Sequence, residues 1–367
     1  MSSAATTVLI MAAGTGGHVF PALSIARCLY DSGIDVQWLG TPAGMENDLL
    51  TGTPYTLHRV PVSGLRGAGM KSKLMAPYMI YKAFVHSRRV MRAVRPACVL
   101  GMGGFVCGPA GLAARVSGIP LLIHEQNAVA GLTNRLLARL SRRVLEAFPG
   151  TFPASSRVRH VGNPVRAEIA ALFEQPRQPV HRYRPLRLLV LGGSQGARAI
   201  NTLIPEILAN WDAEKPEVWH QTGTRNLDAT DSLYASLGVT RDDKCRVVPF
   251  IDDMAEAYSW ADVVVARSGA STVSEIAVAG LPSILVPYPY HRDRQQVFNA
   301  RWLADSNAAY LIEQRDLTAK LLLTRLRDLH EKRMVLDQMS RAARRLAVVD
   351  AAENIAQECR RVIHGAV

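Results

Sequence analysis

The chain has 367 residues, 48% of them hydrophobic, so about two domains with proper cores are expected. Residues 1–165 carry 17 Lys and Arg against 6 Asp and Glu, while residues 166–367 carry 26 against 25, which predicts an anionic partner for the first half alone. The five cysteines form no C-x-x-C pair, no basic signal-peptide start is present, and no apolar run approaches the ~18 residues of a membrane span, so a soluble or peripheral cytosolic protein with reduced thiols is expected.

Short apolar runs alternate with longer amphipathic segments along the chain. Most of the runs precede a Gly, Ser or Pro turn, a pattern typical of parallel sheets with helices on both faces. In such sheets, ligands bind beyond the carboxyl ends of the strands. The expected strands are residues 8–11, 35–39, 98–100, 121–124, 188–191, 263–266 and 283–286.

A glycine loop, residues 14–18 with the sequence G-T-G-G-H, follows the first expected strand. Such a loop lets the backbone approach a phosphate, and the next helix supplies N–H groups. Val19 stands where a dinucleotide fingerprint needs its last glycine, and no acidic residue ends the second strand, so a nicotinamide or flavin site is disfavoured. His18 lies at the positive end of a helix, which lowers an imidazole pKa; a general base and a helix-capping or phosphate-binding histidine are equally open.

A second glycine loop in the same half, residues 101–105, contains Gly103 and Gly104. Glycines also permit close helix–strand packing, so one such loop alone would indicate little. Two of them in one basic domain favour a polyanionic ligand such as a diphosphate.

The segment 71–95 interleaves apolar and cationic residues. This is typical of an interfacial helix on an anionic bilayer, with an ordinary surface helix as the alternative. No basic-aromatic RNA module or recognition helix is present, so no nucleic-acid partner is expected. The predicted membrane contacts are Lys71, Lys73, Leu74, Met75, Met79, Lys82, Phe84, Arg88 and Arg89.

A proline-rich stretch over residues 162–185 marks the predicted boundary between domain 1–165 and domain 166–339. A helix over about 340–367 is expected to pack back on the first domain.

The second domain repeats the strand-and-glycine arrangement at residues 188–196. Residues 267–275 follow a further strand and offer small side chains, hydroxyls and N–H groups to a phosphate. Glu275, one turn on, suits the two hydroxyls of a ribose, or it caps the helix. No D-x-D sequence and no metal-ligand cluster occurs, so chemistry without a metal or cofactor is predicted, with a leaving diphosphate met by N–H groups and a cation such as Arg166. One anion cradle in each half suggests a transferase with two phosphorylated ligands.

Taken together, the motifs closely resemble those of the MurG-type N-acetylglucosaminyltransferase family of bacterial peptidoglycan synthesis. The segments that carry the resemblance are 14–23, 101–104, 124–127, 131–134, 162–166, 192–197, 272–275 and 293–296. The resemblance implies a GT-B fold, with two Rossmann-like domains facing a cleft. It also implies inverting transfer from UDP-N-acetylglucosamine to undecaprenyl-diphosphate-linked muramyl pentapeptide at the cytoplasmic face of the inner membrane. The alternatives are a UDP-N-acetylglucosamine epimerase of the same fold and a non-catalytic nucleotide-sugar-binding protein.

The same resemblance implies roles for individual residues. His18 is the candidate general base, and Gly14, Gly103 and Gly104 would meet the acceptor diphosphate. The implied donor-binding residues are Thr15, Gly16, Gly17, Asn127, Arg166, Ser194, Ile251, Ala270, Ser271, Thr272, Val273, Ser274, Glu275 and Gln295.

Overall fold

The computed structural model describes residues 6–14, 16–61, 70–175, 177, 184–193 and 196–365, with the backbone alone for 70–74. The chain divides into two units. Met1–Arg166 and Asp350–Val367 form the first unit, and Ala167–Val349 forms the second.

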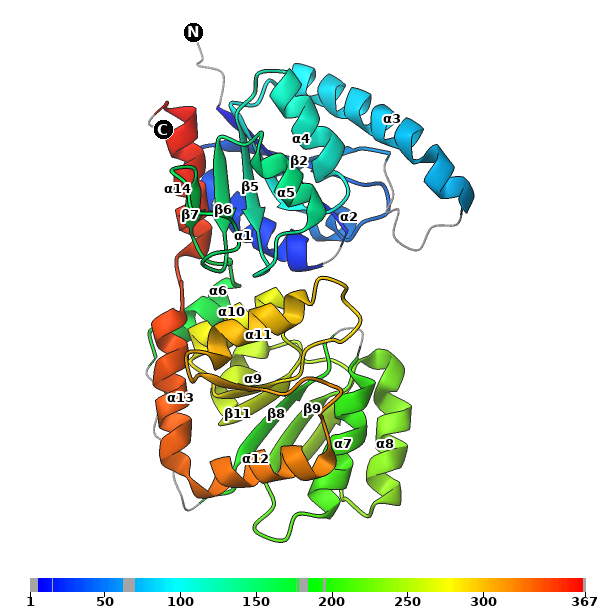
Figure 1. Ribbon diagram of the computed structural model, residues 1–367, viewed down its shortest axis with the longest axis vertical. Coiled ribbons are helices and arrows are strands. Elements are labelled where there is room, and N and C mark those ends of the chain that lie inside the picture. Colours follow the sequence, from blue (N-terminus) through cyan, green and yellow to red (C-terminus); the bar gives the residue numbers. More distant parts are fainter. Residues whose placement is uncertain are drawn as a thin grey trace. The chain divides into compact units, whose positions relative to one another are not determined.

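The first unit is built on a parallel sheet of seven strands, counting only described residues (Figure 1). Across the sheet these are β3 (Thr56–Arg59), β2 (Asp35–Gly40), β1 (Thr7–Ala12), β4 (Cys98–Gly103), β5 (Leu121–Glu125), β6 (Arg143–Glu146) and β7 (Val158–His160). The helices are α1 (Gly16–Asp31), α2 (Glu46–Leu49), α3 (Met70–Val94), α4 (Cys107–Val116), α5 (Leu132–Ala138) and α14 (Ala351–Ile363). No helix in the described part of the chain combines the length and apolar character needed to cross a membrane.

Alternate residues of β1 enter two separate cores. Val8 and Ile10 pack with side chains of α1 and α14, whereas Leu9 and Met11 pack with those of α3 and α4. Because side chains along a strand point to opposite faces, an unbroken apolar run marks a sheet that is covered on both faces.

The second unit has a parallel sheet of six strands among its described residues. Across the sheet these are β10 (Cys245–Val248), β9 (Glu217–Gln221), β8 (Arg187–Leu191), β11 (Val263–Ala266), β12 (Ser283–Leu285) and β13 (Ala309–Leu311). The helical segments are α6 (Ala167–Ala170), η1 (Ala171–Phe173), α7 (Arg198–Ala209), η2 (Thr224–Asn226), α8 (Leu227–Ser236), α9 (Met254–Trp260), α10 (Ala270–Ala279), α11 (Gln295–Ala304), α12 (Ala319–Glu331) and α13 (Arg333–Leu346).

Helices cover both faces of this second sheet as well. Leu188 and Val190 share a core with α7 and α12, and Leu189 is fully buried on the opposite face, where α9 contacts β8. The predicted class, two doubly wound α/β domains, is therefore confirmed.

The end of the chain forms two helices, α13 and α14, rather than one. Ala347 leaves helical geometry with ψ 134°, and the branched side chains of Val348 and Val349 disfavour a helix. α13 contacts α10 of the second unit, whereas α14 contacts α1 of the first. Residues 340–349, which we expected to return to the first domain with the last helix, therefore belong to the second unit.

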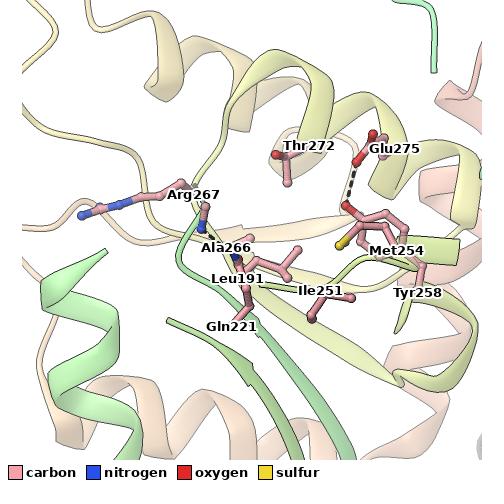
Figure 2. Close-up of a pocket in the computed structure, with 10 residues that line it drawn as sticks. Leu191, Gln221, Ile251, Met254, Tyr258, Ala266, Arg267, Thr272 and Glu275 are labelled. Carbon is pink, nitrogen blue, oxygen red and sulfur yellow. Dashed lines mark hydrogen bonds between the residues drawn. The ribbon is translucent and has the colours of Figure 1, made fainter. Parts of the chain in front are cut away.

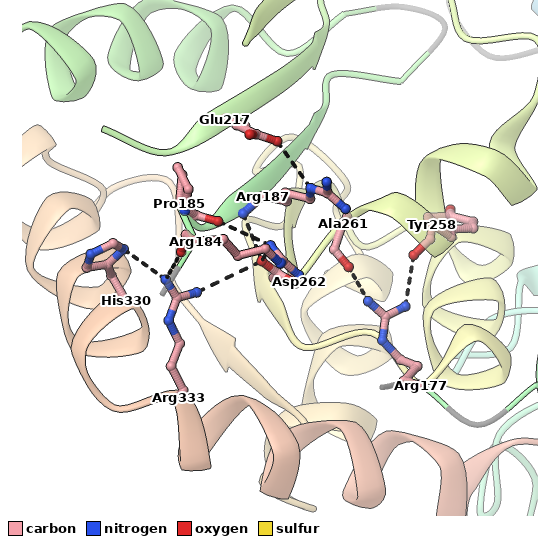
Figure 3. Close-up of polar contacts among 10 residues, drawn as sticks. All are labelled: Arg177, Arg184, Pro185, Arg187, Glu217, Tyr258, Ala261, Asp262, His330 and Arg333. Atoms are coloured by element: carbon pink, nitrogen blue, oxygen red, sulfur yellow. Dashed lines mark hydrogen bonds and ion pairs between the residues drawn. The ribbon is translucent and has the colours of Figure 1, made fainter. Parts of the chain in front are cut away.

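A buried carboxylate joins three segments of the second unit (Figure 3). Asp262 accepts hydrogen bonds from Arg184 Nη1 and Nη2, both at 2.7 Å, and from Arg187 N at 2.9 Å. Arg333 Nη1, at the start of α13, lies 3.9 Å from the same carboxylate. Removing a partner from such a buried group would leave an uncompensated charge, which is strongly destabilising. These contacts therefore hold β8, β11 and α13 together.

Candidate functional site

Both sheets place their first strand in the same way. β1 lies between β2 and β4, and β8 lies between β9 and β11. The winding direction of the chain reverses between β1 and β4 and between β8 and β11. Ligands of doubly wound sheets bind beyond the carboxyl ends of the strands at such switch points. The four loops that the sequence singles out follow β1, β4, β8 and β11.

In the first unit, the loop after β4 packs directly against the loop after β1. A Cβ on Gly103 would lie 2.6 Å from His18 Nδ1, and a Cβ on Gly104 would lie 2.6 Å from Ala13 O. Both glycines also have positive φ, +112° and +87°, so any side chain would be strained there. Cys107 Sγ accepts the Gly103 N–H at 3.2 Å, and burial raises the pKa of this thiol to about 12.

His18, in the first turn of α1, is oriented by a buried glutamine. Its Nδ1 lies 3.3 Å from Gln126 Oε1. Gln126 Nε2 donates to Met102 O at 2.5 Å, and this bond turns the amide oxygen toward the histidine. In the neutral imidazole this network assigns the proton to Nδ1 and the lone pair to Nε2.

The environment of His18 also favours its neutral form. Burial lowers its pKa below the ordinary 6.5, and this outweighs the opposing effects of the Glu125 charge and of the hydrogen bonds with Gln126 and Met102. At about pH 7 the imidazole is therefore a base with an available Nε2 lone pair.

Two buried carboxylates hold the loops around His18. Glu46 Oε2 accepts the Gly14 N–H at 3.1 Å, and its Oε1 accepts the Thr41 N–H at 2.6 Å. Glu125 accepts the Asn127 N–H at 3.0 Å and the Gly131 N–H at 3.1 Å. The Gly14 N–H, predicted to meet a diphosphate, is thus engaged within the protein.

The second unit has a pocket at its switch point (Figure 2). Leu191, Gln221 and Ala266 line it from the carboxyl ends of β8, β9 and β11. The other lining residues are Gly193, Ile251, Met254, Tyr258, Arg267, Thr272 and Glu275. Gln221 Oε1 accepts the Gly193 N–H at 3.2 Å, so the loop after β8 is fastened to the neighbouring strand.

Of the predicted donor residues, Ile251, Thr272 and Glu275 line this pocket. The first three amides of a helix have no partner within the helix, and in α10 these belong to Ala270, Ser271 and Thr272. The next amide, Val273 N, donates to Gly269 O at 2.9 Å, and the side chains of Val273 and Ser274 are buried. The first three amides of this helix therefore lack helical acceptors, which is the arrangement that suits an anion at a helix N-terminus.

Among the described residues, the other predicted ones lie outside this pocket lining. Gly16, Gly17 and Asn127 belong to the first unit, as does Arg166, which is half-buried. Gln295 begins α11 and lies with its Nε2 2.9 Å from His291 Nδ1. Thr15 and Ser194 lie outside the described residues.

α3 presents an apolar row to solvent. Met75, Tyr78 and Tyr81, spaced by three residues, are exposed. Among the predicted membrane contacts, Met75, Lys82 and Arg89 are exposed, whereas Met79, Phe84 and Arg88 are half-buried, with Phe84 against the core. The side chains of Lys71, Lys73 and Leu74 lie outside the described part of the chain.

Sequence reasoning assigned no role to Gln221, Met254 or Tyr258, and it included Arg267 only as the first residue of the segment 267–275. Gln221 ends a strand of sequence E-V-W-H-Q that was not predicted, and Tyr258 sits in α9 without a motif around it. In Figure 2 the Arg267 side chain extends away from Glu275, and its Nη1 donates to Val286 O at 3.1 Å. Within the described residues, no cluster of three or more His, Cys, Asp or Glu side chains could hold a metal ion.

Comparison with known proteins identifies the family. Residues 8–146 match the glycosyltransferase family 28 N-terminal domain, and residues 187–355 match the family 28 C-terminal domain. The UDP-N-acetylglucosamine–N-acetylmuramyl-(pentapeptide) pyrophosphoryl-undecaprenol N-acetylglucosamine transferase of Pseudomonas fluorescens is 51% identical over 359 residues, which are 98% of this chain and 99% of the relative.

Solved structures agree with this likeness. The crystal structure of Acinetobacter baumannii MurG has a TM-score of 0.82 and 39% identity, covering 97% of this chain and 99% of that one. A UDP-N-acetylglucosamine 2-epimerase candidate from Listeria monocytogenes, with a TM-score of 0.69, 14% identity, and coverage of 99% of this chain and 98% of that one, shares the fold alone. The predicted resemblance is confirmed: the chain belongs to the MurG family of GT-B glycosyltransferases, within glycosyltransferase family 28.

Proposed function

We infer that this chain transfers N-acetylglucosamine from UDP-N-acetylglucosamine to undecaprenyl-diphosphate-linked N-acetylmuramyl pentapeptide, the lipid I to lipid II step of peptidoglycan synthesis on which cell shape and division depend. The observation that carries the proposal is the 51% identity over 98% of the chain to a relative named for this reaction. The glycine loops at two switch points support it, because both substrates carry a diphosphate. The alternative, an epimerase, has only a structural likeness at 14% identity in its favour, and such a likeness indicates the fold but not the activity.

The donor is assigned to the second unit. Ile251 lies in the pocket lining, where its backbone would meet the uracil, and the Glu275 carboxylate would accept the ribose hydroxyls. The amides of Ala270, Ser271 and Thr272 would receive the diphosphate, since helix N-termini bind anions. Asn127 and Gln295 would bind sugar hydroxyls, and Arg166 would offset donor charge.

The chemistry is assigned to His18. Its Nε2 would remove the proton from the acceptor sugar hydroxyl as that oxygen attacks the anomeric carbon. The bond from this carbon to UDP breaks on the opposite side, so the configuration inverts. Backbone amides and Arg166 would take up the charge of the leaving UDP, so we expect full activity in EDTA.

Membrane attachment is assigned to α3. Its exposed row of Met75, Tyr78 and Tyr81, together with the exposed cations Lys82 and Arg89, has the composition of a helix that lies on an anionic lipid surface. This would place the protein at the cytoplasmic face of the inner membrane, where its lipid-linked acceptor is anchored.

The transfer is tested with purified protein, UDP-N-acetylglucosamine and the lipid-linked muramyl pentapeptide, with and without EDTA. Mass spectrometry should find one added N-acetylhexosamine on the lipid in both samples. A reaction that consumes the nucleotide sugar without lipid acceptor and yields its epimer would contradict the proposal, and a requirement for Mg²⁺ would contradict the metal-free mechanism.

The membrane assignment is tested by flotation with vesicles of phosphatidylglycerol. The pair Tyr78→Ser and Tyr81→Ser should weaken binding roughly tenfold, which corresponds to about 1.4 kcal/mol. Tyr30→Ser, at an exposed tyrosine of α1, is the matched control and should bind as the parent does. Equal binding of the pair and the parent would remove α3 from the contact surface.

A further inference from the structure

We propose that Tyr258 is a positioning residue that fixes the Glu275 carboxylate in the orientation that accepts a ribose diol. This inference rests on the proposed function, in which the second unit holds a uridine nucleotide. Neither the sequence motifs nor the family likeness points to Tyr258; the geometry of the pocket does.

Tyr258 and Glu275 line the same pocket from two helices, α9 and α10 (Figure 2). The phenol donates to Glu275 Oε2 at 2.9 Å. A carboxylate has about four acceptor positions, so a tyrosine and two ribose hydroxyls can share it.

The tyrosine is more deeply buried than the glutamate. Tyr258 is 1% exposed, so its ring is held by packing and its hydroxyl needs a partner inside the protein. Glu275 is half-buried, and a glutamate side chain has three rotatable bonds whose freedom must be lost before it can bind a ligand. A charge-assisted hydrogen bond from a fixed phenol removes part of that freedom in advance.

The helix that carries Tyr258 is itself fixed at both ends. At its start, Asp253 Oδ1 accepts the Glu256 N–H at 2.8 Å. At its end, Arg177 Nη1 donates to Tyr258 O at 2.8 Å, and Arg177 Nη2 donates to Ala261 O (Figure 3). The phenol is therefore presented from a short helix with little freedom to shift.

The test is a double-mutant cycle on UDP affinity, measured by calorimetry on the full-length protein. Glu275→Ala should weaken binding, and Tyr258→Phe alone should weaken it about fivefold, equivalent to ~1 kcal/mol at 1.4 kcal/mol per tenfold. In the Glu275→Ala background, Tyr258→Phe should have no further effect, because its role passes through the carboxylate. Losses that multiply, or a Tyr258→Phe protein that binds UDP as the parent does, would overturn the proposal.

Two further readouts separate positioning from a general effect on folding. Tyr258→Phe should raise the KM for UDP-N-acetylglucosamine with kcat unchanged, and its preference for UDP over 2′-deoxyuridine diphosphate should shrink. Tyr234→Phe is the matched control, since it removes another buried phenol hydrogen bond, to His220 Nδ1 at 3.0 Å, away from the pocket lining. It should leave UDP affinity unchanged. If Glu275→Ala itself leaves UDP affinity unchanged, the ribose site fails and the Tyr258 proposal with it, while the transfer assay judges the proposed reaction separately.

Discussion

In the first unit, carboxylates accept the amides of the loops around His18, whereas in the second unit a neutral glutamine accepts an amide of the loop after β8. Glu46 holds Gly14 and Glu125 holds Asn127, while Gln221 holds Gly193. The two sheets have the same strand order and place their loops alike, but different side chains accept the amides of those loops. The first site centres on a titratable histidine, and the second on the amides at a helix N-terminus and Glu275. Topology places the two sites alike, and in the proposed function the side chains assign proton transfer to the first unit and nucleotide binding to the second.

The largest expected effect distinguishes the two sites by their contribution to kcat. His18→Ala should lower kcat by about 10²- to 10⁴-fold, the usual contribution of a general base, with UDP affinity unchanged because the nucleotide is assigned to the second unit. Steady-state kinetics and UDP calorimetry measure the two quantities. His364→Ala, at an exposed histidine after α14, is the control. A kcat near that of the parent would reduce His18 to a structural role.

The next effect distinguishes the two sites by their contribution to UDP affinity. Glu275→Ala should weaken UDP binding by about 10- to 100-fold, because hydrogen bonds to a charged group contribute ~1.5–3 kcal/mol. Saturating donor should restore most of kcat. Glu256→Ala, which removes an exposed carboxylate of α9, serves as the matched control in calorimetry. Unchanged UDP affinity in Glu275→Ala would remove this residue from the nucleotide site.

A smaller effect tests how His18 is oriented. Gln126→Met keeps the side-chain volume but removes the hydrogen bond to Nδ1 and one of the interactions that raise the pKa of His18. We expect a loss in kcat of roughly fivefold, from about 1 kcal/mol for one hydrogen bond. The acid limb of the pH–rate profile should also move to lower pH. A limb that stays in place or moves to higher pH would show that another group controls it.

The last effect is on stability rather than on activity, and it concerns what the two units share. Burial lowers the pKa of His124 to about 4 and that of His220 to about 3, from the ordinary 6.5. In the unfolded chain these histidines bind protons near pH 6.5, whereas in the folded units they stay neutral at that pH. The free energy of unfolding therefore falls as the pH drops below that value. Between pH 7.5 and 5.5, each histidine should cost its unit about 1.4 kcal/mol.

Urea unfolding at the two pH values measures this loss. His220→Asn should make the pH dependence of the second unit shallower, while His364→Asn, at an exposed site, should leave it unchanged. A pH dependence that His220→Asn does not alter would contradict the assignment of the proton uptake to this residue.

Much of the fold could be predicted because its central strands are apolar on both faces. β1, β4, β8 and β11 read as unbroken apolar runs before a turn. β9 could not be found in this way, since His220 and Gln221 resemble surface residues until the fold supplies partners, Tyr234 and Asn201 for the histidine. The break between α13 and α14 was likewise missed, because helical periodicity continues on both sides of Val348 and Val349.

The candidate site likewise contains residues that the sequence could predict and residues that it could not. Glycine loops, His18 and Glu275 carry motifs and could be named from the sequence. Gln126 and Tyr258 act on them across long stretches of chain: Gln126 is 108 residues from His18, and Tyr258 is 17 residues from Glu275. Such partners depend on tertiary packing, which no local pattern encodes.

The central claim is that the two switch points have different roles, with the nucleotide bound at that of the second unit. It is tested most directly by amide hydrogen exchange with and without saturating UDP. The account predicts increased protection over residues 267–275, which include the first amides of α10, and smaller changes over residues 101–107. Protection confined to residues 101–107, with none over residues 267–275, would contradict it.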